Sequence, residues 1–422
     1  MRRNYLRTCW VLALILLITG CGHSATASST NSSSSSQTPN NEDTVQIGGS
    51  KNVAQPVKNS TNGSLVPVQV QGLTNVIAIA AGNGDQNGNL GNSAAYALKS
   101  DGSVWAWGNN AFGQLGNNST INSSIPVQVS GLTGITFIAA GYEAGYAVKS
   151  NDTVWAWGKN ESGQLGDNST IDINVPIQVS GLTGINAVAG GYGAAYALKS
   201  DGTVWAWGDN KSGQLGKDTD GGSLVPLKIT GLSHVTSIAT AGRTAYALES
   251  NGTIWTWGER PNNQTWYGAT NSHVPIQIPG LTGIKAIVAG GNSGYALKSD
   301  GTVWAWGGGG EGELSSSSNN KQTPVQIQGV SGVEAIAARS EGGYAVKQDG
   351  TVWGWGGLFG GNLGNNTTKG SAVPIQISEL TNVRNIVSAD YDSYALKTDG
   401  TVLAWGGNPS GQLGNSTINS TK

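Results

Sequence analysis

The sequence of 422 residues predicts an all-β fold, a seven-bladed β-propeller with four antiparallel strands in each blade. Two observations support this prediction. A Trp-x-Trp-Gly motif or a close variant recurs seven times, at intervals of 49 or 50 residues, beginning at residues 105, 155, 205, 255, 304, 353 and 403. Each copy follows a short turn, mostly Asp-Gly or Asn-Gly between apolar residues, which is the strongest local signal of a β-hairpin. Repeats of this length that contain several short strands are typical of radial β architectures.

Each repeat contains four predicted strands. The innermost is a run of small residues such as 77–82, which suits strands that crowd around a central axis. The next two form the hairpin, on either side of a turn such as Ser100–Gly102. The outermost begins with proline, as at Pro67–Val70. It belongs at the edge of the sheet, because proline cannot donate a hydrogen bond to a neighbouring strand.

The tryptophans are predicted to be structural, since 13 of the 15 lie in the repeated motif. Trp105 and Trp107 are two residues apart, so both point to one face of their strand while Ala106 points to the other. A bulky face against a small one is how neighbouring blades would interlock. Rows of Trp can also stack sugars or bases, but the strict period favours packing between blades. The Gly-Gln-Leu-Gly segments, such as residues 113–116, are expected to fix the loop that leads into the outer strand.

The ends of the repeat region predict a closed ring. Seven strands that begin with proline are present, and the first precedes any blade that it could complete. The chain ends at Lys422, just before an eighth such strand would fall. We therefore expect residues 66–70 to form the outer strand of the last blade, which removes the exposed edge of an open array.

The N-terminus has the features of an export signal. Three Arg and an apolar run precede Ile18–Cys21, which resembles a bacterial lipobox, a signal that is cleaved before a Cys that becomes lipidated. A plain signal peptide or a buried helix would be the alternatives. We expect a signal peptide over 1–20, a flexible Ser/Thr/Asn-rich tether over 21–62 with lipidated Cys21, the propeller over 63–416 and a tail over 417–422. The protein would then be exported and held on the bacterial cell membrane, outside the cytoplasm, by its lipid alone.

The composition argues against several functions. With 11% charged residues, a net charge of −2 and a pI near 5.9, the chain has no basic footprint for nucleic acid, and loss of the signal peptide with its three Arg would lower the net charge to −5. Both Cys precede the predicted propeller, and its two His, His234 and His273, are too far apart for a metal motif. We expect no catalysis, no cofactor and no metal. Two acidic segments, at Asp85 and Asp218, match a calcium loop only in part.

The segment Tyr196–Gly216 and the strand that follows it resemble the repeat of the regulator of chromosome condensation family, and the resemblance extends over residues 64–415. Family repeats usually carry His-Ser where this chain has Ala195–Tyr196, so a role of that His does not transfer. The resemblance implies a propeller that binds other proteins. Nuclear members act as nucleotide exchange factors and chromatin binders. Secreted bacterial relatives, including a β-lactamase inhibitory protein, grip a target with one face of the propeller.

The loops after the innermost strand and after Trp-x-Trp-Gly should share one face, because the strands alternate in direction. These loops vary between repeats, and the first repeat has nine extra residues there. Aromatic residues outside the repeat period, mixed with Arg, are typical of interface hot spots. The candidate partner-binding residues are Phe112, Tyr142, Glu143, Tyr192, Arg243, Trp266, Tyr267, Arg339, Phe359 and Tyr391. The same loops carry charged residues such as Lys159, Glu161, Lys211 and Glu259.

Several functions remain open at this level. We expect a monomeric, non-catalytic scaffold that binds a protein partner through the variable loop face. A polysaccharide- or cell-wall-binding, lectin-like module would use the same aromatic residues. An enzyme would have to draw on the carboxylates that share this face, which are Glu143, Glu341, Asp390 and Asp392. Drift of unconstrained loops would also explain their variation.

Overall fold

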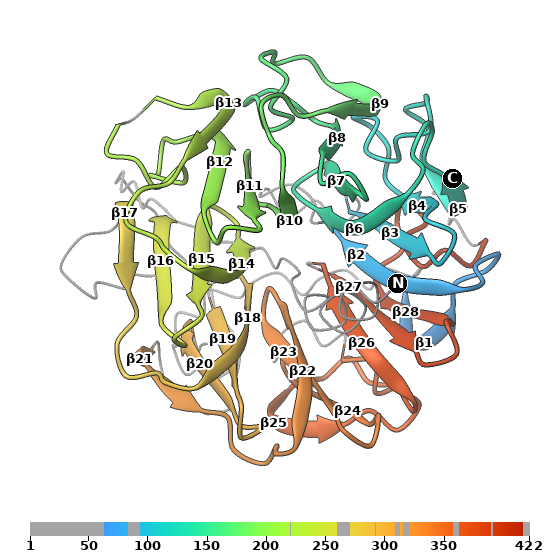
Figure 1. Ribbon diagram of the computed structural model, residues 1–422. Coiled ribbons are helices and arrows are strands. Elements are labelled where there is room, and N and C mark those ends of the chain that lie inside the picture. The colour runs from blue at the N-terminus through green and yellow to red at the C-terminus, as the bar shows by residue number, and fades with distance from the viewer. Residues whose placement is uncertain are drawn as a thin grey trace, which may run out of the picture.

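The computed structural model describes residues 63–82, 93–219, 221–259, 271–291, 293–308, 313–314, 321–357, 363–389 and 391–416. In these residues, 28 strands form seven four-stranded antiparallel sheets. The sheets stand as blades around a central axis, and the chain visits them in order around the ring (Figure 1). The predicted seven-bladed β-propeller is therefore confirmed. The predicted signal peptide, the tether with Cys21 and the tail lie outside the described residues.

The blades are numbered along the chain, and their strands run in chain order from the axis outwards. Blade 1 contains β2 (Val76–Ala81), β3 (Ala94–Lys99), β4 (Val104–Gly108) and β5 (Ser123–Gln128). Blade 2 contains β6 (Ile135–Ala140), β7 (Ala144–Lys149), β8 (Val154–Gly158) and β9 (Ile173–Gln178). Blade 3 contains β10 (Ile185–Gly190), β11 (Ala194–Lys199), β12 (Val204–Gly208) and β13 (Ser223–Lys228). Blade 4 contains β14 (Val235–Ala241), β15 (Thr244–Glu249), β16 (Ile254–Glu259) and β17 (Asn271–Gln277).

Blades 5 to 7 complete the ring. Blade 5 contains β18 (Ile284–Gly290), β19 (Ser293–Lys298), β20 (Val303–Gly307) and β21 (Lys321–Gln326). Blade 6 contains β22 (Val333–Arg339), β23 (Gly342–Lys347), β24 (Val352–Gly356) and β25 (Ser371–Gln376). Blade 7 contains β26 (Val383–Ser388), β27 (Asp392–Lys397) and β28 (Val402–Gly406), and its outer strand is β1 (Ser64–Gln69) from the start of the described chain.

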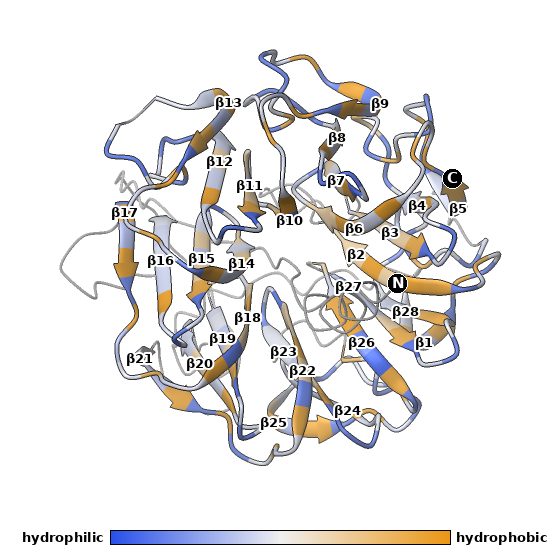
Figure 2. Cartoon of the chain, in the orientation of Figure 1, coloured by the Kyte–Doolittle hydropathy of each residue, from blue (hydrophilic) through white to orange (hydrophobic). Residues whose placement is uncertain are grey.

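The hydrophobic core lies between the blades. Every residue of the middle strand β11 except the terminal Lys199 is buried, because the faces of this strand are covered by neighbouring blades. Figure 2 shows the hydrophobic residues concentrated in the strands, while the connections are mostly hydrophilic or neutral. The repeated sequence thus builds the same packed layer between one blade and the next.

The ring closes as predicted. β1 pairs antiparallel with β28, with Val68 opposite Ala404 (Figure 1). Two further backbone hydrogen bonds, each 2.9 Å, join the residues after β1 to this blade, from Val70 N to Val402 O and from Gln71 N to Gly414 O. The first described strand therefore completes the last blade.

The outer strands differ from the prediction in where they begin. We expected each to start at its proline, but β5 starts at Ser123, three residues before Pro126. The pairing of β4 with β5 jumps from Ala106–Val127 to Gly108–Ser123, and Pro126 lies in the skipped stretch. Proline is accommodated there because an irregular edge strand leaves its nitrogen out of the ladder. β1 shows the same pattern around Pro67.

The second Trp of each motif joins neighbouring blades. The Trp157 side chain is fully buried, and its Nε1 donates to the backbone carbonyl of Gln114 in blade 1 at 2.8 Å. The hydroxyl of Tyr96 donates to the same carbonyl at 2.7 Å, and the Tyr96 and Trp157 rings meet edge to face at 5.9 Å. Equivalent carbonyls accept both bonds at Gln164, Gln214, Glu313 and Gln412. The Gly-Gln-Leu-Gly loops are therefore part of the seams between blades.

The first Trp of each motif has a different environment. Trp155 lies on the same face of β8 as Trp157, as predicted, but it is only half-buried. The ammonium group of Lys149, the last residue of β7, lies 4.0 Å from the centre of its ring. We expected both tryptophans to pack between neighbouring blades, but mainly the second one, Trp157 in this blade, does so.

The two faces of the ring carry the loops expected of them. On one face, the hairpin turn at Gly102 lies beside the crossing into the next blade, and its carbonyl accepts from Ile135 N. On the other face, the loop after the innermost strand lies beside the loop after Trp-x-Trp-Gly. There Lys159 N donates to Glu143 O at 2.9 Å, and Glu259 N donates to Arg243 O at 3.1 Å.

Candidate partner-binding surface

Five of the predicted partner-binding residues lie in one continuous row over blades 1 to 4. The row runs from Phe112 in blade 1, through Tyr142 and Glu143 in blade 2 and Tyr192 in blade 3, to Arg243 in blade 4. Lys159, Glu161 and Glu259 complete it through ion pairs. We call these eight residues the cation–aromatic row.

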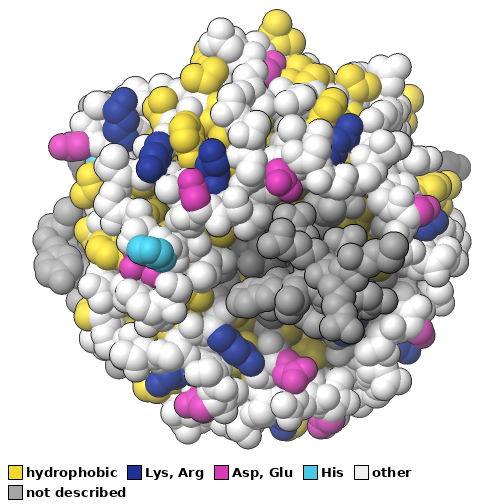
Figure 3. Space-filling model, viewed as in Figure 1, with side chains coloured by type: hydrophobic (Ala, Val, Ile, Leu, Met, Phe, Trp, Pro, Cys, Tyr) yellow, Lys and Arg dark blue, Asp and Glu magenta, His cyan; other side chains and the backbone are white. Residues whose placement is uncertain are grey.

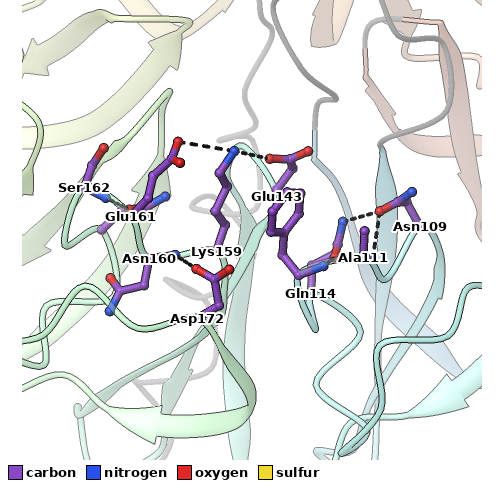
Figure 4. A network of polar contacts seen from close by, with 11 residues as sticks. Asn109, Ala111, Gln114, Glu143, Lys159, Asn160, Glu161, Ser162 and Asp172 are labelled. Atoms are coloured by element: carbon purple, nitrogen blue, oxygen red, sulfur yellow. Dashed lines mark hydrogen bonds and ion pairs between the residues drawn. The ribbon is translucent and has the colours of Figure 1, made fainter.

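Lys159 links the first two blades of the row. Its ammonium nitrogen lies 2.9 Å from Glu143 Oε2 and 3.3 Å from Glu161 Oε1 (Figure 4). The same nitrogen lies 4.5 Å from the centre of the Phe112 ring and 5.6 Å from that of Tyr142. Partial burial alone would lower the pKa of Lys159, but the hydrogen bond and the charge of Glu143, with those of Glu161, raise it above its ordinary value. The cation is thus enclosed by two carboxylates and two rings.

Glu143 is held in an unusual backbone conformation. Its φ of 55° lies in the left-handed region, which residues with a side chain rarely adopt, and the equivalent residue of blade 3 is Gly193 with a φ of 68°. Its side chain is 1% exposed, against 13% for Lys159. Left-handed backbone at a residue other than glycine is found mostly where the surroundings fix it, often at functional sites. Here the strained turn directs a buried carboxylate at the ammonium group.

The second half of the row continues the same scheme. The Tyr142 and Tyr192 rings meet edge to face with their centres 4.4 Å apart. The guanidinium carbon of Arg243 lies 4.5 Å from the centre of the Tyr192 ring, and its Nη1 lies 3.3 Å from Glu259 Oε2. In both halves a cation rests on a ring from the preceding blade and pairs with a carboxylate of its own blade. Each contact of a cation with a ring contributes about 0.5–1 kcal/mol where it is exposed and more where it is desolvated.

Replacing Lys159 with Gln should lower the free energy of unfolding by about 2 kcal/mol, because the buried Glu143 carboxylate loses its cation. Lys211, an exposed residue of the corresponding loop in blade 3, supplies the matched control. Lys211→Gln should change the free energy of unfolding by less than about 0.5 kcal/mol. Urea unfolding of both variants measures the difference, and equal losses would show that the Glu143 pair does not stabilise the loops.

The remaining predicted residues are not in the row. Arg339 is the last residue of β22 in blade 6 and is 3% exposed. Its guanidinium group lies against Gly357. Tyr391 is half-buried in blade 7, and its carbonyl accepts from Gly407 N at 2.9 Å. Both lie outside the four blades that carry the row, in blades 6 and 7. The other three candidates, Trp266, Tyr267 and Phe359, lie outside the described residues.

The pairing of Lys159 with Glu143 and of Arg243 with Glu259 was not predicted. The sequence places all four residues in the variable loops, but it does not say which side chains meet across or within blades. Their spacing of 16 residues, Glu143 to Lys159 and Arg243 to Glu259, is the recoverable signal. It is the distance between the two loops that lie side by side in each blade.

Neither a metal-binding cluster nor a membrane-spanning helix occurs among the described residues. In the part of the chain that the structure describes, no group of three or more His, Cys, Asp or Glu is placed to hold a metal ion. Of the calcium candidates, Asp218 is exposed, whereas Asp85 and Asp220 lie outside the described residues. The described segments include no helix with the length and apolar character needed to cross a bilayer. Figure 3 shows charged side chains of both signs scattered among uncharged ones on the viewed face.

Two sequence models of the regulator of chromosome condensation (RCC1) repeat match the chain. One matches residues 101–148, 151–198 and 201–248, and the other matches residues 135–164, 185–214 and 284–313. The matched segments contain strands from blades 1 to 5. No curated protein sequence matches the chain.

Solved structures show the same fold. The chain is similar to human WBSCR16, with a TM-score of 0.67 and 19% identity over 81% of this chain and 88% of that one. It is similar to yeast RCC1 (Prp20), solved with Kap60 bound, with a TM-score of 0.63 and 21% identity over 80% and 82% of the two chains. A second structure, of Prp20p from Saccharomyces cerevisiae, gives a TM-score of 0.63 and 22% identity over 80% of this chain and 84% of that one. Prp20p is described there together with its binding to Gsp1p and histones.

Proposed function

Because the chain belongs to the regulator of chromosome condensation repeat family, we propose that it is a non-catalytic scaffold that binds a protein partner through its variable loop face. The cation–aromatic row carries this proposal. It brings together predicted loop residues of four successive blades on one face. Aromatic rings and Arg side chains are the groups that contribute most of the energy in protein interfaces.

Solved relatives support a protein partner in general terms. Yeast RCC1 has been crystallised with Kap60, and Prp20p has been described with its binding to Gsp1p and histones. Kap60, Gsp1p and histones are partners of those relatives and are not proposed as partners of this chain. For this chain the lipobox-like segment favours an exported protein that is anchored at the bacterial cell membrane through Cys21 and faces outside the cytoplasm. We propose a monomer that presents its loop face to a partner in that compartment.

A protein partner is favoured over a polysaccharide by the state of the rings. Sugar binding of the lectin type would need open aromatic faces for stacking. In the row, Lys159 covers one face of Phe112, Arg243 covers one face of Tyr192, and Tyr142 is buried. The row therefore offers charged groups beside partly covered rings, which suits the side chains of a protein.

Site-directed variants on the two faces test the proposal. Tyr192→Ala combined with Arg243→Ala removes the second half of the row, while Lys199→Ala removes a cation over Trp205 on the hairpin-turn face. We expect cross-linking in intact cells, followed by mass spectrometry, to recover one specific protein with the wild-type chain and with Lys199→Ala. Recovery should fall at least tenfold with the double variant, although its thermal unfolding remains cooperative. Equal recovery from all three chains would refute binding at the row, and saturable binding to a glycan array would favour the lectin-like alternative.

A further inference from the structure

The seam between blade 7 and blade 1 contains a buried carboxyl group that the proposed partner surface does not use. Asp392 is the first residue of β27 and is 3% exposed. The residues at the same position of the other blades are uncharged: Ala94, Ala144, Ala194, Thr244, Ser293 and Gly342. The closing seam is therefore chemically distinct from the other six.

Asp392 belongs to a chain of hydrogen bonds that joins the two blades. Ser93 Oγ of blade 1 donates to Asp392 Oδ1 at 2.9 Å. The hydroxyl oxygen of Tyr394 lies 2.5 Å from Asp392 Oδ2 and 2.8 Å from the carbonyl oxygen of Gln412. That carbonyl also accepts from Nε1 of Trp107 in blade 1, at 2.8 Å. All five residues are buried.

The number of protons available in this hydrogen-bond network decides the charge of Asp392. A Tyr hydroxyl carries one proton and can donate it only once. In four other seams the equivalent Tyr donates to the equivalent carbonyl. If Tyr394 does the same, the 2.5 Å contact needs a proton on Asp392, because two acceptor oxygens that share no proton repel each other. A protonated Asp392 donates to Tyr394 and accepts from Ser93, and each oxygen of the network then has a hydrogen-bond partner.

We propose that Asp392 is protonated in the closed ring under mildly acidic conditions and that its ionisation at higher pH weakens the seam between blades 7 and 1, which makes ring closure sensitive to pH. Once ionised, the carboxylate competes with the Gln412 carbonyl for the single proton of Tyr394. That competition loosens a contact which four other seams keep at every pH in the physiological range, since the acceptor there is a backbone carbonyl alone.

The electrostatic surroundings support a neutral Asp392. Desolvation by burial raises its pKa to about 6, although the hydrogen bonds from Tyr394 and Ser93 lower it in part. Tyr394 is the titratable group in contact with the carboxyl, and its own pKa is raised by burial and by Asp392. None of the ion pairs among the described residues involves Asp392. Asp390 and Asp85, the other carboxyls whose chain positions flank the seam, lie outside the described range.

The sign of the effect follows from linkage. The pKa of Asp392 is raised from 3.8 to about 6 in the folded ring, so the ring binds this proton more tightly than an opened form does. The proton on Asp392 therefore contributes most to the free energy of ring closure below about pH 4. This contribution falls as the pH rises to about 6 and stays constant above that. Between pH 5 and pH 8 the equilibrium constant for opening the seam should rise about tenfold.

Hydrogen exchange of the full chain at pH 5 and pH 8, corrected for the intrinsic pH dependence of exchange, tests the proposal. We expect protection of amides in β1, β3 and β28 to fall about tenfold at pH 8, while amides of β11 and β12 change little. Asp392→Asn should abolish the difference, because the Asn amide donates to Tyr394 and accepts from Ser93 at any pH. An equal fall in all blades, or the same fall in Asp392→Asn, would overturn the proposal.

A second measurement keeps the test independent of whether Asp392→Asn folds. Infrared spectra of the wild-type chain with isotope-labelled Asp should show the carbonyl stretch of one protonated carboxyl that persists above pH 5 and disappears around pH 6. Exposed Asp residues such as Asp101 and Asp201, whose pKa values are lowered by hydrogen bonds from the following turn, serve as internal controls because they ionise at lower pH. Loss of every protonated Asp signal below pH 4 would also refute the proposal.

Discussion

Trp157→Ala is expected to lower the free energy of unfolding by about 4 kcal/mol, within the range of about 3–5 kcal/mol found when a buried Trp is truncated. The Trp157 side chain is fully buried between blades 1 and 2, so its loss leaves a cavity that the rigid blades cannot close. It also removes the 2.8 Å hydrogen bond to the Gln114 carbonyl and the edge-to-face contact with Tyr96. Urea unfolding of the purified variant, followed by Trp fluorescence, measures the loss.

Trp155→Ala is the matched control, since it removes the same side chain two residues away on the same strand. Trp155 is half-buried and lies under Lys149, so its truncation should cost only about 1–2 kcal/mol. A ratio of at least two between the variants is expected. If the two losses were equal, the seams would not depend on the second Trp of the motif, and the assignment of the packing core between blades would be wrong.

Removal of residues 1–69 should be the most damaging change, because it deletes β1 and leaves β28 as an open edge. The deletion removes the pairing of Val68 with Ala404 and of Gln69 with Leu403. An unpaired strand edge is a template for association with other chains. We expect a fall in the thermal unfolding midpoint of at least about 10 °C, together with concentration-dependent aggregation, because the packing energy of a whole strand is lost.

Removal of residues 1–62 is the control for this deletion. It keeps β1, which starts at Ser64, and deletes only the predicted signal peptide and tether. The midpoint and the monomeric state should match those of the longer chain when both are compared without the lipid. A large loss of stability from this shorter deletion would contradict the predicted domain boundary at residue 63, while an intact propeller after removal of residues 1–69 would show that β1 does not hold the ring closed.

The fold could be predicted from the sequence because each blade repeats one solution. A strand that carries Trp105 and Trp107 at alternate positions, preceded by an Asp-Gly turn, defines a hairpin wherever it occurs. Seven copies and one surplus edge strand then define a closed ring. The start of the outer strand was mispredicted, since the skipped pairing around Pro126 depends on how two strands meet and leaves no mark in the local pattern.

The candidate surface could be predicted only in part. The variable loops and the face they share follow from the alternation of strands, and five predicted residues do meet in the row. Which cation rests on which ring depends on the rotation between successive blades. The role of Asp392 was beyond local analysis for the same reason, because its partner Ser93 is 299 residues away and approaches only when the ring closes.

The pairing of β1 with β28 also determines the order in which the molecule can be made. Blades 1 to 6 are each continuous in sequence, so each can form soon after its own residues leave the ribosome. β1 is synthesised before any of them, yet its partner β28 is the last of the described strands to appear. β1 therefore stays without its β28 partner while six blades are synthesised. Contacts between residues so distant in sequence form slowly. Maturation of the protein should end with a single late step, the docking of the oldest strand onto the newest.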